Sequence, residues 1–130
     1  MKRIIAAREQ YRLEVDPAKN RIYYTMSGFW RDPADFPDYF EDYKKAVAAV
    51  RPGFTVLTDV REFKAPAQSV KPLFDEQQRR LNKAGLKKVA EVFSQNAIVK
   101  LSLDHIAKRS GMQKRDFTDF ADAEAWLDEE

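Results

Sequence analysis

The sequence has no cysteine and a single histidine, His105, among its 130 residues. Without cysteine the chain cannot form disulfides, use a thiol nucleophile or bind a metal through thiolates. A single histidine also excludes a multi-histidine metal site within one chain. His105 falls in a predicted helix and no nucleophile is paired with it, so we interpret it as a partly exposed helix residue.

Glycine-rich motifs are missing as well, since the chain has only four glycines. No GxGxxG or GxxxxGKS/T segment is present to hold a phosphate, and no GxSxG segment is present to expose a catalytic serine. Carboxylates are abundant, but no two are spaced as an acid–base pair. These absences predict no cofactor and disfavour an enzyme, although an enzyme of unknown reaction stays open as an alternative.

Long apolar runs are also lacking. The apolar run at residues 4–7 is too short for the core of a signal peptide, and Arg8 and Glu9 end it. Other apolar stretches fall far short of the roughly 20 residues that a membrane-spanning helix needs. The sequence therefore predicts no membrane insertion and a cytoplasmic location.

Basic side chains are in excess only in the middle of the chain. Residues 66–118 hold 11 basic and 5 acidic side chains, whereas residues 119–130 hold 6 acidic side chains and no basic one. Many of these cations fall near the ends of predicted helices, where they complement the helix dipole. No aromatic side chains alternate with them to stack on bases, so we predict no nucleic-acid binding.

The composition that remains is that of an ordinary globular protein, with 44% hydrophobic and 34% charged residues. A chain of this length buries roughly two-thirds of its unfolded surface on folding, which is enough for one core. No repeat or long linker divides it. We therefore expect a single domain over residues 1–130, in which residues 1–9 form a loose N-terminal segment.

Hydrophobic periodicity predicts the order β-β-α-β-α-β-α-β-α. The first two strands are joined by a short turn and should form an antiparallel hairpin, while strands separated by helices should run parallel. The sequence therefore predicts an α/β fold with a mixed, mostly parallel, five-stranded sheet. The predicted strands are 10–16, 21–27, 54–60, 88–93 and 114–117. The predicted helices are 33–51, 70–84, 97–110 and 121–127.

The first predicted helix has a clear apolar face. Asp32 should cap its start, with Pro33 at the first helical position. The spacing predicts that the apolar face packs against the sheet. The residues on this face are Phe36, Tyr39, Phe40, Tyr43, Val47 and Val50.

Candidate functional residues follow the third predicted strand. Asp59 stands at the end of this strand, where its carboxylate can accept hydrogen bonds from backbone N–H groups, and we interpret it as structural. Sites in open α/β sheets lie beyond the carboxyl ends of the strands. The candidate interaction surface there is Arg61, Phe63, Lys64 and Ser69. Ser69 is also predicted to cap the next helix.

Several segments of the sequence resemble segments of one known group of proteins. They are Asp16-Pro17, Asn20-Arg21-Ile22, Ser27-Gly28-Phe29, the stretch 52–61, the stretch 88–92 and the stretch 123–127. Together they resemble the SpoIIAA-like, STAS-related proteins over about residues 11–127. The resemblance implies a β-α superhelix around a mixed sheet and a small cytoplasmic binding module.

The same resemblance implies a regulatory role. Regulated members carry a phosphorylatable serine in an Asp-Ser-Ser-Gly-like loop, where this chain has Ala65-Pro66-Ala67-Gln68-Ser69. Ser69 is the only hydroxyl in that stretch, and it is displaced from the motif. The wider fold group is also similar to CRAL-TRIO lipid carriers, although this chain is much shorter.

Two functions remain besides the enzyme. The first is a non-enzymatic regulatory or scaffolding module that binds a protein partner through the loop and helix after Val60. The second is a carrier of a small apolar ligand, suggested by nine Phe, five Tyr and two Trp. We also expect a homodimer, because the hairpin strands and helix ends leave surface that a second copy can cover.

Overall fold

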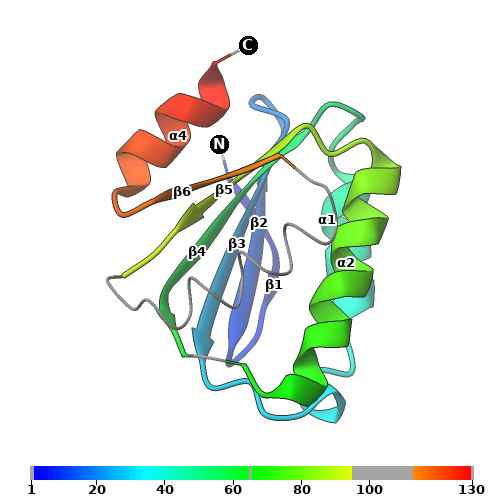
Figure 1. Ribbon diagram of the computed structural model, residues 1–130. Helices are drawn as coiled ribbons and strands as arrows, with labels where there is room; N and C mark the ends of the chain where they lie inside the picture. Colours follow the sequence, from blue (N-terminus) through cyan, green and yellow to red (C-terminus); the bar gives the residue numbers. More distant parts are fainter. Residues whose placement is uncertain (1, 65, 95–112, 130) are drawn as a thin grey trace.

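One mixed sheet of six strands organises the molecule (Figure 1). The structure is a computed structural model that describes residues 2–64, 66–94 and 113–129. Neighbours in sequence are neighbours in the sheet; the β1–β2 and β2–β3 pairs are antiparallel, and the later pairs are parallel. The strands are β1 Arg3–Ala7, β2 Tyr11–Asp16, β3 Arg21–Gly28, β4 Thr55–Phe63, β5 Lys88–Val92 and β6 Lys114–Phe117.

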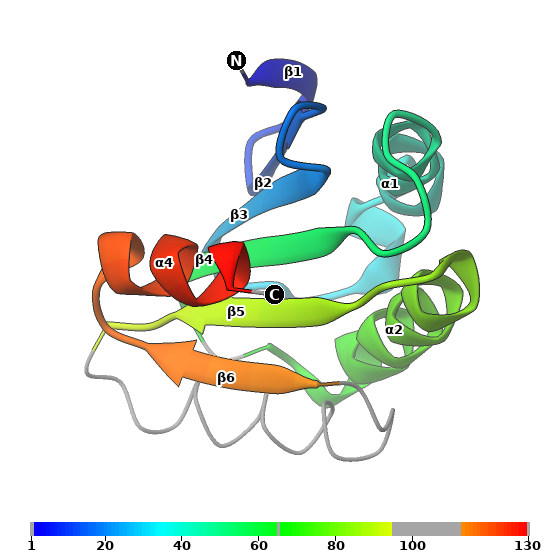
Figure 2. The ribbon, with the colours of Figure 1, turned by 90° about the horizontal axis from the view of Figure 1, so that it is seen from above.

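The described helices cover the two faces of the sheet unequally. α1 and α2 lie on one face, and α4 lies on the other, over β4, β5 and β6 (Figures 1 and 2). Parallel crossovers that advance in one direction place their helices on one face, whereas α4 follows the last strand. The helices are η1 Pro33–Asp35, α1 Tyr39–Ala48, η2 Gln68–Val70, α2 Lys71–Ala84 and α4 Phe120–Asp128. The predicted helix 97–110, with His105, lies outside the described residues.

The N-terminal segment is not loose, and the predicted strand count was wrong. β1 pairs with β2 from Arg3 opposite Val15 to Ala7 opposite Arg12, which makes six strands instead of five. The register shifts between Ile4 and Ala6. Such a bulge breaks the alternation of inward and outward side chains on which a strand prediction depends.

The single long helix predicted from Pro33 was also wrong. Asp32 does cap a helix start, because its carboxylate accepts a hydrogen bond of 2.9 Å from the N–H of Ala34. The helix it caps is the short η1. Phe36 precedes Pro37, and a residue before proline is pushed out of the helical region. Phe36 accordingly has φ −127°.

α1 therefore starts at Tyr39, and its inward face contains Tyr39 and Tyr43 as predicted, together with Asp42 and Ala46. Phe40 and Val47, which were predicted on the buried face, are only partly buried.

The other described elements lie close to the prediction. α2 ends at Gly85, whose φ of 104° is left-handed, and a Cβ there would lie 2.9 Å from Pro52. Glycine is therefore required at this position. α4 begins after Asp119, whose carboxylate accepts a hydrogen bond from the N–H of Asp122.

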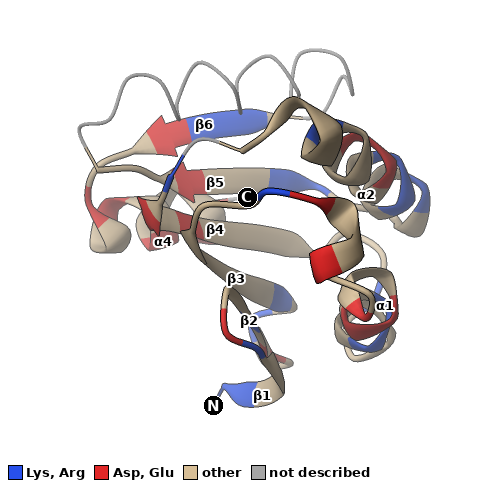
Figure 3. Cartoon of the chain, turned by 90° about the horizontal axis from the view of Figure 1, so that it is seen from below, with Lys and Arg blue, Asp and Glu red and all other residues tan. Residues whose placement is uncertain are grey.

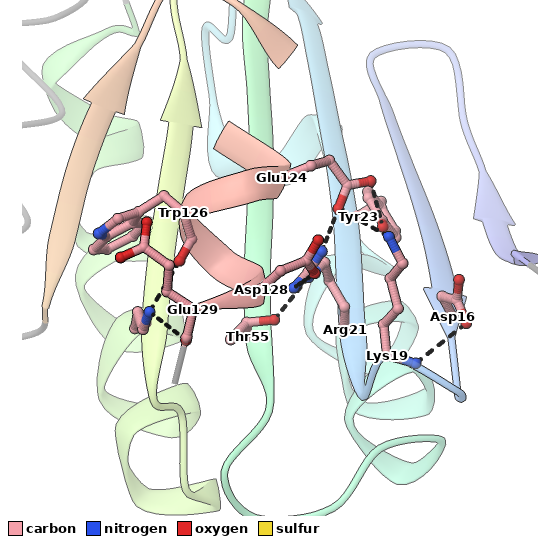
Figure 4. A network of polar contacts seen from close by, with 10 residues as sticks. Asp16, Lys19, Arg21, Tyr23, Thr55, Glu124, Trp126, Asp128 and Glu129 are labelled. Carbon is pink, nitrogen blue, oxygen red and sulfur yellow. Dashed lines mark hydrogen bonds and ion pairs between the residues drawn. The ribbon is translucent and has the colours of Figure 1, made fainter. Parts of the chain in front are cut away.

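A polar network attaches α4 to the amino ends of the parallel strands (Figure 4). Arg21 is 2% exposed and donates to Thr55 Oγ1 at 2.9 Å. Its guanidinium also pairs with Glu124 and Asp128 of α4. Tyr23 donates to Glu124 at 2.7 Å. Because a buried charge is tolerated only when it is paired, this network makes the position of α4 specific.

Candidate functional site

The connections that leave β3 and β4 run side by side at the carboxyl edge of the parallel strands. Lys64 N–H donates to the carbonyl of Gly28 at 2.9 Å, and Ala67 N–H donates to the carbonyl of Trp30 at 2.9 Å. The two segments thus continue the pairing of the strands into the loop region. Among the exposed residues that they carry, we call four the carboxyl-edge surface: Phe29, Arg31, Lys64 and Ser69.

Trp30 fixes this surface to the core. Its side chain is 0% exposed, and its indole N–H donates to the carbonyl of Ser27 at 3.0 Å. Its ring stacks on Phe36 at 4.1 Å between centroids and lies 5.4 Å from Phe74. Because neighbouring residues of an extended segment point to opposite sides, burying Trp30 turns Phe29 outward. Phe29 is 48% exposed.

The turn between β1 and β2 supports the surface from the other side. Gln10 donates through its amide to the carbonyl of Phe29 at 3.0 Å. Arg8 forms two hydrogen bonds with Asp42 of α1, at 2.9 and 3.0 Å, and Tyr11 donates to the same carboxylate at 2.6 Å. These contacts attach the turn to α1.

The charge state of Asp42 is set by this network. Burial alone would raise the pKa of the Asp42 carboxyl, but the hydrogen bonds from Arg8 and Tyr11 hold the pKa below its usual value. Burial and the bond to Asp42 raise the pKa of Tyr11, so that its hydroxyl stays a donor. The turn is therefore held by a permanently ionised pair over the ordinary pH range.

A groove of about 170 Å³ lies beside this turn. Its floor is aromatic and its rim carries both signs of charge. Figure 3 shows basic and acidic positions close together along the connection from β3 to α1. The groove is lined by Arg8, Glu9, Gln10, Tyr11, Phe36 and Asp38 among others.

Asp59 and Arg61 form a local pair on β4. Asp59 accepts a hydrogen bond from the N–H of Arg61 at 3.1 Å and two more from the guanidinium, at 3.0 and 2.7 Å. These bonds raise the pKa of Arg61. Both residues lie within β4, whereas Arg61 was predicted in a loop. Arg61 is exposed, but its charge is already paired.

Phe63 does not belong to the surface. It is the last residue of β4, is 2% exposed and contacts the ring of Trp30 at 5.9 Å between centroids. The sequence placed the end of β4 at Val60, because the polar pair Arg61-Glu62 interrupts the apolar run. Lys64, the next residue, is exposed.

Ser69 is exposed, but it does not cap α2. It lies inside η2, and its hydroxyl donates to the carbonyl of Arg31 at 3.1 Å. α2 has no side-chain cap, and its preceding residue is Val70. Ser69 therefore links the two connections of the carboxyl-edge surface instead of stabilising a helix start.

The sequence analysis missed Phe29, Arg31 and the Asp42 network. Gly28 has φ 74°, which marks the end of β3, and it precedes two adjacent aromatic residues. In an extended segment only one of two adjacent side chains can point inward, so the pair Phe29-Trp30 predicts that one of the two rings is exposed. Nothing in the sequence pairs Arg8 or Tyr11 with Asp42, because these contacts join residues more than 30 positions apart.

Comparison with known proteins gives the fold. No family model matches the sequence, and no curated protein sequence matches it. A solved structure that matches is an uncharacterized protein from the DUF3478 family with a SpoIIAA-like fold, from Shewanella loihica PV-4. The match has a TM-score of 0.59 and covers 98% of this chain and 92% of that chain. The chain has a SpoIIAA-like fold. At 13% identity the likeness extends to the fold alone.

The SpoIIAA-like fold confirms the resemblance found in the sequence. Within its described residues no helix is long and apolar enough to cross a membrane. In the same residues no three acidic or histidine side chains gather to hold a metal ion. The carboxyl-edge surface carries one aromatic ring, two cations and a hydroxyl group.

Proposed function

We propose that this chain is a non-enzymatic module that binds a protein partner through the carboxyl-edge surface. The observation that carries the proposal is the exposed ring of Phe29, which stands on the rigid support of Trp30. Aromatic residues and arginine are enriched among the residues that dominate binding energy at protein interfaces. Arg31 and Lys64 flank the ring and would pair with carboxylates of the partner.

The rigidity of the surface supports this proposal. The surface is already ordered in the free chain. Backbone hydrogen bonds join the two connections, the Ser69 hydroxyl binds the carbonyl of Arg31, and the Gln10 amide binds the carbonyl of Phe29. A surface that is already ordered loses little conformational entropy on association. The groove beside Gln10 gives room for a side chain of the partner next to Phe29.

The small volume of the cavity inside the fold favours a partner protein over a small apolar ligand. Ligand pockets commonly measure roughly 300 to 1,000 Å³. The cavity between α2 and the sheet, as the described residues line it, measures about 30 Å³ and has polar groups in its wall. We place the interaction in the cytoplasm as part of the same proposal.

Site-specific photo-crosslinking in native cells tests the proposal. A photoreactive phenylalanine analogue at position 29 should cross-link the chain to one protein species. The same analogue at Ile4, which is 58% exposed on the edge strand β1, is the matched control. Cross-linking of that same protein species at both positions, or none at position 29, would contradict a partner site at the carboxyl edge.

A charge-reversal pair gives a second readout. Phe29→Ala with Lys64→Glu should lower recovery of the cross-linked species by about tenfold or more, which is 1.4 kcal/mol of binding energy. Ile4→Ala with Lys87→Glu removes an exposed apolar side chain and reverses a lysine charge elsewhere, since Lys87 is exposed and precedes β5. This control should bind as the wild type does. Unchanged recovery with the first variant would remove the proposal.

A further inference from the structure

The groove beside the turn between β1 and β2 carries more negative than positive groups. Three carboxylates line it: Glu9 of the turn, Asp35 of η1 and Asp38, which precedes α1. The one cation of the described lining is Arg8, which donates two hydrogen bonds to Asp42 at 2.9 and 3.0 Å. Because this pair offsets the charge of Arg8, the groove is negative toward a group that enters it.

Two of the three carboxylates have no partner of their own. Glu9 and Asp35 are exposed, and neither forms an ion pair or a side-chain hydrogen bond within the described part of the chain. Asp38 lies 3.8 Å from Arg8, which is longer than a hydrogen bond, and its side chain does not cap α1. The groove therefore presents carboxylate oxygens that can accept hydrogen bonds from a ligand.

The floor of the groove suits an apolar stem. Tyr11, Phe36 and Pro37 line it, and the two rings lie 6.4 Å apart between centroids. The stack of Phe36 on Trp30 at 4.1 Å holds this floor in place. A volume of about 170 Å³ is smaller than that of ordinary small-molecule pockets and fits one long side chain. The matching side chain has an apolar stem and a cationic head.

The arrangement of the carboxylates favours a planar cation over a metal ion. Among the described residues, no three acidic or histidine side chains lie close enough together to hold a metal ion. The guanidinium group of arginine spreads five N–H donors over a plane and is weakly hydrated, whereas the ammonium group of lysine is compact and strongly hydrated. The arginine stem also packs on apolar surface while its head stays among polar groups.

We propose that this groove binds an arginine side chain of the partner protein, with its stem on the aromatic floor and its guanidinium group at Asp35 and Glu9. The inference rests on the proposed function, because Gln10 lines the groove and donates to the carbonyl of Phe29 at 3.0 Å. A partner that contacts Phe29 therefore reaches the groove as well. Its arginine would meet the carboxylates, and its acidic side chains would meet the two cations of the carboxyl-edge surface. This pattern of charges would fix the orientation of the partner.

Titration of the purified chain with N-acetyl-L-arginine amide tests the groove without a partner. The probe should cause saturable NMR shifts at the backbone amides of residues 8–11 and 35–36. N-acetyl-L-citrulline amide, which has nearly the same shape but no charge, should cause none, and neither should sodium chloride at the same ionic strength. An equal response to the citrulline probe, or no saturable response to the arginine probe, would overturn the proposal.

Variants locate the response in the groove. Asp35→Asn with Glu9→Gln should weaken binding of the arginine probe by about fivefold or more, because two partly exposed ion pairs are lost. Asp122→Asn with Glu129→Gln is the matched control, since both residues are exposed and lie at the two ends of α4. The control should bind the probe as the wild type does. Unchanged binding in the Asp35→Asn, Glu9→Gln protein would overturn the assignment.

Cross-linking separates this inference from the proposed function. In a chain with the photoreactive analogue at position 29, Asp35→Lys should lower recovery of the cross-linked species by about tenfold or more, whereas Asp122→Lys should leave it unchanged. Recovery that Asp35→Lys does not lower would overturn the arginine assignment and leave the partner site intact. No cross-linking at position 29 would instead overturn the partner site, while the arginine probe reports on the groove independently.

Discussion

At the scale of single residues, Asp42 shows how one buried carboxylate positions a functional surface. Its side chain is 3% exposed, and it binds both Arg8 and Tyr11. Removing one member of a buried ion pair leaves the other unpaired and is costly, although the half-exposed Arg8 reduces that cost. We therefore expect Asp42→Asn to lower the free energy of unfolding by about 2 kcal/mol.

The same residue predicts a pH dependence. Because the folded pKa of Asp42 lies below its unfolded value of about 3.9, its contribution is present above that value and is lost as the pH falls through the folded pKa. Urea unfolding of wild type and Asp42→Asn should therefore differ at neutral pH and converge below about pH 4. Asp38→Asn is the control, since Asp38 is 59% exposed and lies 3.8 Å from Arg8. A gap between wild type and Asp42→Asn that is constant with pH would contradict the role of the ionised carboxylate.

Asp59 should contribute less than Asp42. It accepts the N–H of Arg61, but its charged partner is 46% exposed, and exposed ion pairs contribute little. We expect Asp59→Ala to lower the free energy of unfolding by about 1 kcal/mol, the low end for a lost hydrogen bond. Chemical denaturation measures this. A change within error would show that Asp59 has no structural role.

At the scale of elements, two buried cations hold α4: Lys88 donates to the carbonyls of Trp126 and Glu129, and Arg21 pairs with the acidic side chains of the helix. Arg21 is the only residue of β3 that pairs with both Glu124 and Asp128 in the described part of the chain. Arg21→Ala should therefore lower the free energy of unfolding by about 3 kcal/mol, the scale of a broken buried pair. Hydrogen exchange should show the loss of protection concentrated in α4.

Lys19→Ala is the matched control for that experiment. Lys19 is 42% exposed and lies 3.6 Å from the same Glu124, so its loss should cost well under about 1 kcal/mol. If Arg21→Ala destabilised all elements equally while α4 kept its relative protection, the network would not be what attaches this helix.

The elements also show where sequence reasoning works. β6 and α2 were predicted almost to the residue; for α2, the apolar spacing and the glycine that follows it, Gly85, agree with each other. α1 was misplaced because Pro37 breaks the helix, although Phe36 continues the apolar spacing across the break. β1 was missed because its bulge at Ile4 removes the alternation of side chains.

The candidate site was predictable only in part. The carboxyl edge followed from strand order, and Lys64 and Ser69 do lie exposed there. Phe63 was misassigned, because strand ends are set by pairing with a neighbour, and β3 pairs with β4 as far as Phe63. The burial of Gln77 followed from its place in the helical spacing of Leu73, Phe74 and Leu81, whereas the lack of a donor to its side-chain oxygen among the described residues depends on the elements packed around it.

At the scale of the whole molecule, the sheet has an open edge at β1. Within the described residues β1 pairs with β2 on one side only, and Ile4 on it is 58% exposed. An unpaired edge strand can pair with the same strand of a second copy about a two-fold axis, and antiparallel pairing makes such a contact self-complementary. The bulge and Arg3 weaken this edge, so we expect a dimer that forms only at high micromolar concentration.

Light scattering over a concentration series tests this expectation. The mass should rise toward that of a dimer with the wild type, and Ile4→Arg should keep the chain monomeric, because charges of the same sign would then face each other across the edge. Phe29→Arg alters the other exposed large hydrophobic residue of the described chain and should leave self-association unchanged. If Phe29→Arg abolished the dimer and Ile4→Arg did not, self-association would use the carboxyl-edge surface and would compete there with the proposed partner. A monomer mass at every concentration would instead show that the bulge and Arg3 protect the edge completely.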